Sequence, residues 1–227
     1  MNTLIPSRSR LQQRGFTMIE MIGVLAIIAI LAVIVVPKVF STIAGSRVTS
    51  AVASINAMRT AVTEYAGRFG TVPLTTSSAN ARIDDLLIAS QMLDNRFVVK
   101  IGTQPGTALS AGAVWNSTTG AWTGGQTQAT QSRIICSLAT PATVPSAALG
   151  ANFRLNGGNT NLPAGSRVVA AVLMRITGTE ALDLSQRIDG TALSQTNATT
   201  PDNNGKVVYA LPDAQGLTDA YVYLAHQ

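Results

Sequence analysis

One glutamate lies inside an otherwise apolar segment, and this position indicates a chemical role more clearly than that of any other residue. The 21 residues from Phe16 to Val36 are nearly all apolar, and Glu20 lies near their beginning. A carboxylate within a membrane helix costs about 2.5–3.5 kcal/mol at mid-bilayer, and less near the interface, so it usually has a partner or a function. Because Glu20 is only four residues into the run, headgroups and water could relieve part of this cost.

The element that must position Glu20 is a membrane helix. A helix of this length spans roughly 31 Å, which matches the hydrocarbon core of a bilayer. Arg8, Arg10 and Arg14 precede it, so the N-terminus is expected to stay cytoplasmic and the rest to be exported, with Lys38 as a weak opposing signal. No A-x-A-like cleavage pattern follows the run, and we therefore expect residues 16–37 to be retained as a single-pass helix.

The residues around this helix resemble a known processing signal. Gly15 precedes Phe16, Glu20 follows four residues later, and the apolar run ends at Pro37. This arrangement is similar to the class III signal of type IV pilins and type II secretion pseudopilins. The resemblance implies that a prepilin peptidase cuts between Gly15 and Phe16, and that Phe16 becomes N-methylated. It also implies a short, basic leader, and residues 1–15 fit that description.

The resemblance gives Glu20 and Pro37 roles in assembly. Cleavage creates an ammonium at Phe16, and Glu20 of a neighbouring subunit can act as its counter-ion, so that one contact offsets two desolvation costs. In this family the pairing sets the axial register of a subunit in the filament. Pro37 has no amide hydrogen and its ring presses on the carbonyl of Val33, which predicts a kink or a locally melted turn. Pro37 can also simply mark the membrane exit.

Residues 38–70 are expected to continue the helix as an amphipathic segment whose apolar face is covered by a sheet. Apolar residues recur there every three or four positions, which is the period of one helix face. They are Val48, Val52, Ile55, Met58, Val62, Tyr65 and Phe69. Gly67, Gly70 and Pro73 are expected to end the helix. The sequence EYAGRFGTVP in this region also resembles the segment that ends the long helix in pseudopilins.

Residues 71–227 are expected to form a globular, β-rich head, since they are rich in Gly, Ser, Thr, Asn, Ala and Val. A short helix is expected within residues 80–97, with Asp84 and Asp85 in its first turn, where carboxylates suit the helix dipole. Trp115 and Trp122 flank a turn sequence, which predicts a hairpin. The candidate strands are Phe97–Ile101, Ala113–Trp115, Ala121–Thr123, Arg133–Leu138, Val168–Ile176, Val207–Leu211 and Tyr221–Ala225.

The expected fold class is therefore α+β and pilin-like, with a long N-terminal helix packed on a C-terminal antiparallel β-sheet head. The helix spans the membrane in its first half. We expect four regions, which are a prepilin leader, a transmembrane and assembly helix, its amphipathic continuation, and a periplasmic or surface head. Their bounds are 1–15, 16–37, 38–70 and 71–227.

Several chemistries are disfavoured by composition. Cys136 is the only cysteine and His226 the only histidine, which leaves no intrachain disulfide, no common zinc site and no triad with an internal histidine. The candidate carboxylates of an enzyme show no motif spacing; they are Asp94, Glu180, Asp183 and Asp189. Without residues 1–15 the chain has 13 basic and 11 acidic residues, and its net charge falls from +5 to +2. We expect neither catalysis nor specific nucleic-acid binding.

No cofactor is expected, and calcium is the weak exception. Some pseudopilins bind calcium in a C-terminal loop, and Asp202, Asn203 and Asn204 offer oxygen atoms beside the turn dipeptide that Asn204 forms with Gly205. The loop has one carboxylate and no obvious bidentate acid at the right distance.

The sequence thus predicts a structural subunit of a filament, anchored in the bacterial inner membrane with its N-terminus cytoplasmic before assembly. Its expected partners are further copies, other pilin-like subunits, a prepilin peptidase and an inner-membrane assembly platform. The missing disulfide and the EYAGRFGTVP segment favour a pseudopilin of a type II secretion system. The size of the head favours the alternative, a type IV pilin of a surface pilus used for adhesion, motility or DNA uptake. A membrane-tethered periplasmic enzyme or binding module is the distant alternative.

Overall fold

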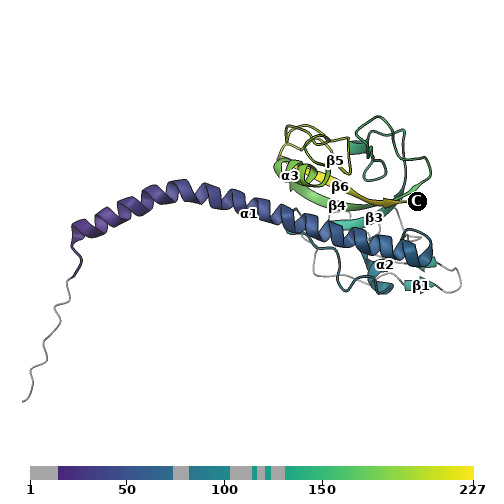
Figure 1. The fold of residues 1–227 in the computed structure, drawn as a ribbon, viewed down its shortest axis with the longest axis horizontal. Coiled ribbons are helices and arrows are strands. Elements are labelled where there is room, and N and C mark those ends of the chain that lie inside the picture. The colour runs from purple at the N-terminus through teal and green to yellow at the C-terminus, as the bar shows by residue number, and fades with distance from the viewer. Residues whose placement is uncertain (1–14, 74–81, 103–113, 117–120, 124–130) are drawn as a thin grey trace, which may run out of the picture. The chain divides into compact units, whose positions relative to one another are not determined.

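The computed structural model describes residues 15–73, 82–102, 114–116, 121–123 and 131–227. Its elements are α1 (Met18–Phe69), α2 (Asp84–Ala89), β1 (Val114–Asn116), β2 (Ala121–Thr123), β3 (Arg133–Leu138), the 3-10 helix η1 (Pro145–Ala147), β4 (Arg167–Thr177), α3 (Gly178–Asp189), β5 (Val207–Tyr209) and β6 (Leu217–His226) (Figure 1). The chain divides into two compact units, one ending at Ile43 and the other beginning at Ala44. The long N-terminal helix and the antiparallel sheet confirm the predicted α+β fold.

Helix α1 is continuous through Pro37. Of the two expected effects of Pro37, the locally melted turn is therefore absent, and the kink stays a prediction. Pro37 leaves the carbonyl of Val33 without its usual amide partner, but the helix retains its conformation on both sides of the proline. Helix α1 ends where Gly70 adopts a left-handed φ of 68°, and the amide of Gly70 still reaches the carbonyl of Ala66 at 2.9 Å.

In the second unit, α1 buries five of the seven residues that the sequence predicts for its covered face, and Val52 is partly buried against the same core. The buried residues of α1 are Val48, Ala51, Ile55, Met58, Ala61, Val62 and Tyr65. Phe69 instead remains 52% exposed, because it is the last helical residue and the chain turns away directly after it. Its ring lies against that of Tyr65, with the ring centroids 4.5 Å apart. The prediction that Phe69 belongs to the covered face is therefore wrong.

The four-stranded sheet has the order β3-β4-β6-β5, and every neighbouring pair is antiparallel. The central strand β4 is buried on both faces, as its alternating side chains show. Val169, Ala171 and Leu173 join the core cluster that includes the α1 face. Their neighbours in β4 face a second cluster on the opposite side, with Phe153 and Tyr221. The sheet therefore lies between α1 and the segment that precedes β4.

Six of the seven predicted strands are present, with shifts of a few residues at their ends. The hairpin is confirmed, because β1 pairs with β2 and Trp115 lies opposite Trp122. The strand predicted at Phe97–Ile101 is wrong. Alternate residues of that segment are buried, as in a strand, but it joins neither sheet among the described residues. The amide of Phe97 donates instead to the Asp84 carboxylate, at 3.2 Å.

The helices of the second unit confirm one prediction and add one element. Helix α2 is the short helix expected within residues 80–97, with Asp84 and Asp85 in its first turn, and both carboxylates also bind arginines. Arg82 bonds Asp84 in an ion pair that is fully buried, and Arg96 bonds Asp85. Helix α3 is an element that the sequence analysis did not predict, although the T-x-x-E capping box at residues 177–180 indicates a helix start.

Candidate functional site

The apolar surface of the first unit has no cover. Every described residue from Gly15 to Ile43 is exposed, including Phe16 at 80%. α1 is the one helix in the described part of the chain that is long and apolar enough to cross a membrane, and none of its most apolar window is buried. Burying a leucine or isoleucine side chain is worth about 1.5–3 kcal/mol. An exposed apolar helix surface of this size is therefore expected to be covered by lipid or by another apolar partner.

Glu20 closes a capping box at the start of α1. The Thr17 amide and the Thr17 hydroxyl both donate to Glu20 Oε2, each at 2.8 Å. In return, the Glu20 amide donates to Thr17 Oγ1 at 3.3 Å. Since the first amides of a helix have no partner within it, this box supplies one and fixes where the helix begins.

The box by itself does not distinguish an assembly residue from a helix cap. Thr177 and Glu180 form the same arrangement at the start of α3, in a unit with an ordinary hydrophobic core. What distinguishes Glu20 is its surroundings, which are an uncovered apolar helix. Both Thr17 bonds go to Oε2, and Oε1 receives none from the described residues. A carboxylate oxygen with free lone pairs can accept from a cation on a second molecule.

The Gly15–Phe16 peptide lies outside the hydrogen-bonded helix, immediately before its first residues. A Cβ built on Gly15 would meet no atom within 4 Å, so the backbone here is open to an approaching protein. The structure therefore places Gly15, Phe16 and Glu20 within one exposed turn. Pro37 lies in the same helix, about 17 residues or roughly 26 Å beyond Glu20.

The hydroxyls that follow Pro37 are directed back to the helix backbone. Ser41 Oγ and Thr42 Oγ1 both donate to the carbonyl of Lys38, at 2.9 Å each. Two polar side chains at the end of the apolar segment are thereby satisfied within the helix, which lowers the cost of placing them against an apolar neighbour.

The side-chain oxygens of two predicted calcium ligands, Asp202 and Asn203, accept hydrogen bonds within the second unit, and Asn204 takes part through its backbone amide. Asp202 is fully buried, and its carboxylate accepts from the Ser185 hydroxyl at 2.8 Å and from the Asn204 amide at 3.2 Å. Asn203 Oδ1 accepts from the amide of Ser146 at 2.9 Å. Burial raises the pKa of Asp202 above its ordinary value. The described residues contain no group of three or more His, Cys, Asp or Glu side chains suited to a metal. Calcium binding here stays a prediction.

The carboxylates weighed for catalysis do not converge. Asp94 is exposed, Glu180 caps α3, and Asp183 pairs with Arg187 one helical turn away at 2.8 Å. Asp189 connects the end of α3 to the start of β5, because its oxygens accept the backbone amides of residues 206 and 207 at 2.8–2.9 Å. Sequence reasoning missed this role, since nothing in the local sequence shows which distant amides a carboxylate will meet.

The comparisons with known proteins concern the N-terminal segment. Residues 10–36 match the family described as the prokaryotic N-terminal methylation motif. No curated protein and no solved structure matches the chain. The matched residues contain Gly15, Phe16 and Glu20, and the match confirms the prepilin-type motif that the sequence predicts.

Proposed function

We propose that this chain, a type IV pilin-like precursor by its N-terminal motif, is a structural subunit that assembles into a filament through its N-terminal helix. The observation that carries the proposal is the methylation motif at the start of a helix whose apolar surface is uncovered. A membrane can cover that surface before assembly, and the helices of other subunits can cover it afterwards. The same surface thus serves in anchoring and in polymerisation.

Processing is the first step of the proposed pathway. A prepilin peptidase cuts between Gly15 and Phe16, where the backbone is open, and the new amine at Phe16 is methylated. The uncut chain lies in the inner membrane with its arginine-containing leader in the cytoplasm and its second unit outside, in keeping with the positive-inside rule. An assembly platform in that membrane then extracts the subunit.

Ordered addition of subunits is the second step. We infer that the Phe16 ammonium of one copy meets Glu20 of its neighbour. The Thr17 box supports this role, because it holds Glu20 at the helix start through Oε2, and no described residue bonds to Oε1. In an apolar environment an unpaired carboxylate is costly, so a copy placed out of register would lose several kcal/mol.

The proposed system is a type II secretion system, in which the subunit would form a short periplasmic pseudopilus. The single cysteine favours this branch, because many pilins close a C-terminal loop with a disulfide. A surface pilus is the second candidate, favoured by a second unit that extends from Ala44 to Gln227.

Mass spectrometry of the protein purified from membranes tests the proposal. The expected N-terminal residue is Phe16 carrying one methyl group. An intact Met1 terminus in cells that hold a prepilin peptidase would refute the proposal and favour a membrane-tethered enzyme or binding module. Deleting the gene then separates the branches: lost secretion without lost surface fibres indicates a pseudopilin, whereas the reverse indicates a pilin.

A further inference from the structure

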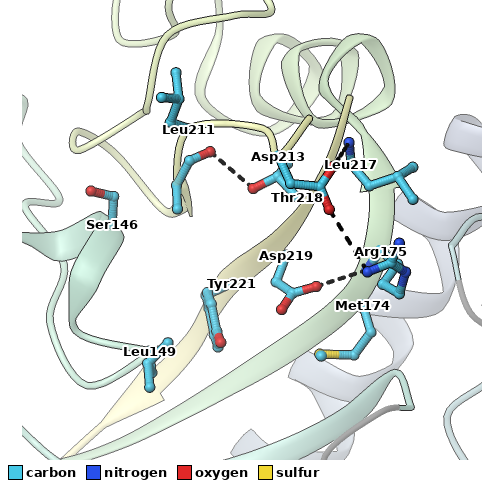
Figure 2. A pocket seen from close by; sticks show the side chains of 11 residues that line it. Ser146, Leu149, Met174, Arg175, Leu211, Asp213, Leu217, Thr218, Asp219 and Tyr221 are labelled. Atoms are coloured by element: carbon cyan, nitrogen blue, oxygen red, sulfur yellow. Dashed lines mark hydrogen bonds and ion pairs between the residues drawn. The ribbon is translucent and has the colours of Figure 1, made fainter. Parts of the chain in front are cut away.

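A cavity of about 400 Å³ opens in the second unit where β4 and β6 begin to diverge from their regular pairing. Figure 2 shows Ser146 and Leu149 on one side of it, and Met174 and Arg175 on the other. Leu211 and Leu217 complete the apolar part of its lining. This volume is at the small end of protein binding sites and accommodates one or two large side chains.

The polar side of the cavity carries an excess of negative charge. Asp213 and Asp219 lie there with a single cation, Arg175. The Arg175 backbone has a left-handed φ of 53°, and its amide donates to Asp219 Oδ1 at 2.8 Å. Its guanidinium is 3.8 Å from Asp213 and more than half exposed, so it neutralises that carboxylate only weakly. Arg133 also interacts electrostatically with Asp219, but it does not line the cavity. Within the lining, two carboxylates and one arginine favour a ligand that brings a positive charge.

The rim of the cavity indicates a protein ligand. Leu149 and Leu211 are 62% and 63% exposed, although both line the cavity. A small molecule inside it would leave these two side chains in water, whereas a second protein surface would cover them. Exposed leucines around a concave site are typical of interaction surfaces.

A matching projection lies at the C-terminal end of α1. Phe69 is 52% exposed, and the neighbouring Arg68 is exposed in the last helical turn. None of the described residues bonds to the Arg68 guanidinium. We call these two residues the knob. An aromatic ring beside a guanidinium is a frequent anchor in protein interfaces, and it complements an apolar cavity with acidic walls.

The knob and the cavity lie at opposite ends of β6. The side chain of Gln227, directly after β6, bonds to Gly70 and Val72, which directly follow the knob. The cavity is lined by residues at the start of β6, from Leu217 to Tyr221. From Tyr221, the lining residue of β6 nearest the knob, to Gln227 the strand runs six residues, or roughly 20 Å. The knob therefore cannot enter the cavity of its own chain, but it can enter that of a second copy.

We propose that Arg68 and Phe69 of one copy insert into the cavity lined by Leu149, Leu211, Asp213 and Asp219 of the next copy. The two surfaces differ, so the contact is heterologous, which is the class of contact that can repeat from copy to copy along a filament. The inference rests on the proposed function and adds a second contact to the one between N-terminal helices. It assigns both partners of that contact to the second unit.

Cysteine cross-linking in the full-length, processed chain tests this contact. In a Cys136→Ala background, Phe69→Cys and Leu211→Cys together are expected to give a ladder of covalent oligomers on mild oxidation. Each single substitution is expected to give no ladder. The matched control combines Phe69→Cys with Val98→Cys, because Val98 is similarly exposed at 50% and does not line the cavity. All four chains carry surface substitutions, so their equal abundance in membranes verifies that they fold.

A charge reversal provides the second readout. Arg68→Glu is expected to lower the yield of sheared filaments about tenfold, which corresponds to about 1.4 kcal/mol. Arg47→Glu, a change of the same exposed residue type on α1, is expected to leave the yield unaltered. Two results would overturn the contact and leave the proposed function intact. One is a normal filament yield with no ladder from the Phe69–Leu211 cysteine pair, and the other is the same ladder from the Phe69–Val98 control pair. An unprocessed N-terminus would overturn both.

Discussion

Replacing Glu20 by glutamine separates its two roles at the start of α1. Glutamine can close the Thr17 capping box as glutamate does, because its side-chain oxygen also accepts from an amide. It cannot neutralise the ammonium of a neighbouring Phe16. The complementary change, Thr17→Ala, removes the hydroxyl that bonds Glu20 at 2.8 Å and accepts the Glu20 amide at 3.3 Å, but keeps the charge.

The expected magnitudes differ widely. Loss of a capping side chain costs about 1 kcal/mol, or roughly fivefold in an equilibrium. Two unit charges 4 Å apart interact by about 4 kcal/mol at an effective dielectric constant of 20, and removing one partner leaves the other charge unpaired in apolar surroundings. Glu20→Gln is thus expected to reduce assembly at least a hundredfold more than Thr17→Ala.

The assay is the amount of chain recovered in sheared or overexpressed filaments, normalised to the processed chain in membranes. The yield is normalised because processing precedes assembly. Mass spectrometry that finds Phe16 as the N-terminal residue shows that a variant has been processed. Glu20→Gln filaments at near wild-type yield, or a Thr17→Ala defect as deep as that of Glu20→Gln, would refute the pairing and leave Glu20 as a helix cap.

Three further predictions concern the second unit, each measured on the full chain in detergent. Burial raises the pKa of Asp202, so its contribution to folding is present below the ordinary aspartate pKa and is lost as pH rises through the raised one. Asp202→Asn should therefore gain stability relative to wild type as pH rises above the ordinary aspartate pKa. A pH-independent difference in melting temperature would contradict this. Arg82→Met leaves the Asp84 carboxylate buried without its arginine, and should lower the free energy of unfolding in urea by about 3–5 kcal/mol. Arg187→Ala breaks an exposed pair with Asp183 and should lower it by less than about 1 kcal/mol. Equal losses in the two variants would contradict the role of burial. Burial raises the pKa of Cys136 from 9.0 to about 11, so native Cys136 should react with iodoacetamide at pH 8 about a hundredfold more slowly than the unfolded chain, and similar rates would show an accessible thiolate.

The candidate site could be predicted because its signals are local. Gly15, Phe16, Glu20 and Pro37 lie within 23 consecutive residues, the first two immediately before helix α1 and the others within it, so the sequence alone fixes their spacing. The two-residue alternation of apolar side chains that predicts β4 is also a pattern of neighbouring residues. The same holds for the spacing of apolar residues, every three or four positions, that predicts the buried face of α1. The hairpin of β1 and β2 follows from a turn between two tryptophans.

The sequence predictions fail where the outcome depends on a contact, or on the end of an element, that the local pattern does not show. Phe97–Ile101 alternates as a strand does, yet a strand also needs a neighbour to pair with, and Asp84 takes the amide of Phe97 instead. Asp84 and Asp85 do lie in the first turn of α2, as predicted, but the sequence did not indicate that Arg82 and Arg96 bind them. Phe69 fits the apolar period of α1, but the helix ends at that residue and leaves its ring half in water.

The sequence by itself therefore determined the membrane helix, the processing motif and the α+β class, because apolar periodicity and short-range spacing act within a few turns of chain. Only the tertiary structure decided the strand order β3-β4-β6-β5, the buried arginine pair and the cavity at the start of β6. The strand order and the cavity join residues that are far apart in the sequence, whereas Arg82 and Asp84 are neighbours whose burial depends on the packing around them. All three features depend on how all the buried surfaces pack at once, and no single segment carries that information.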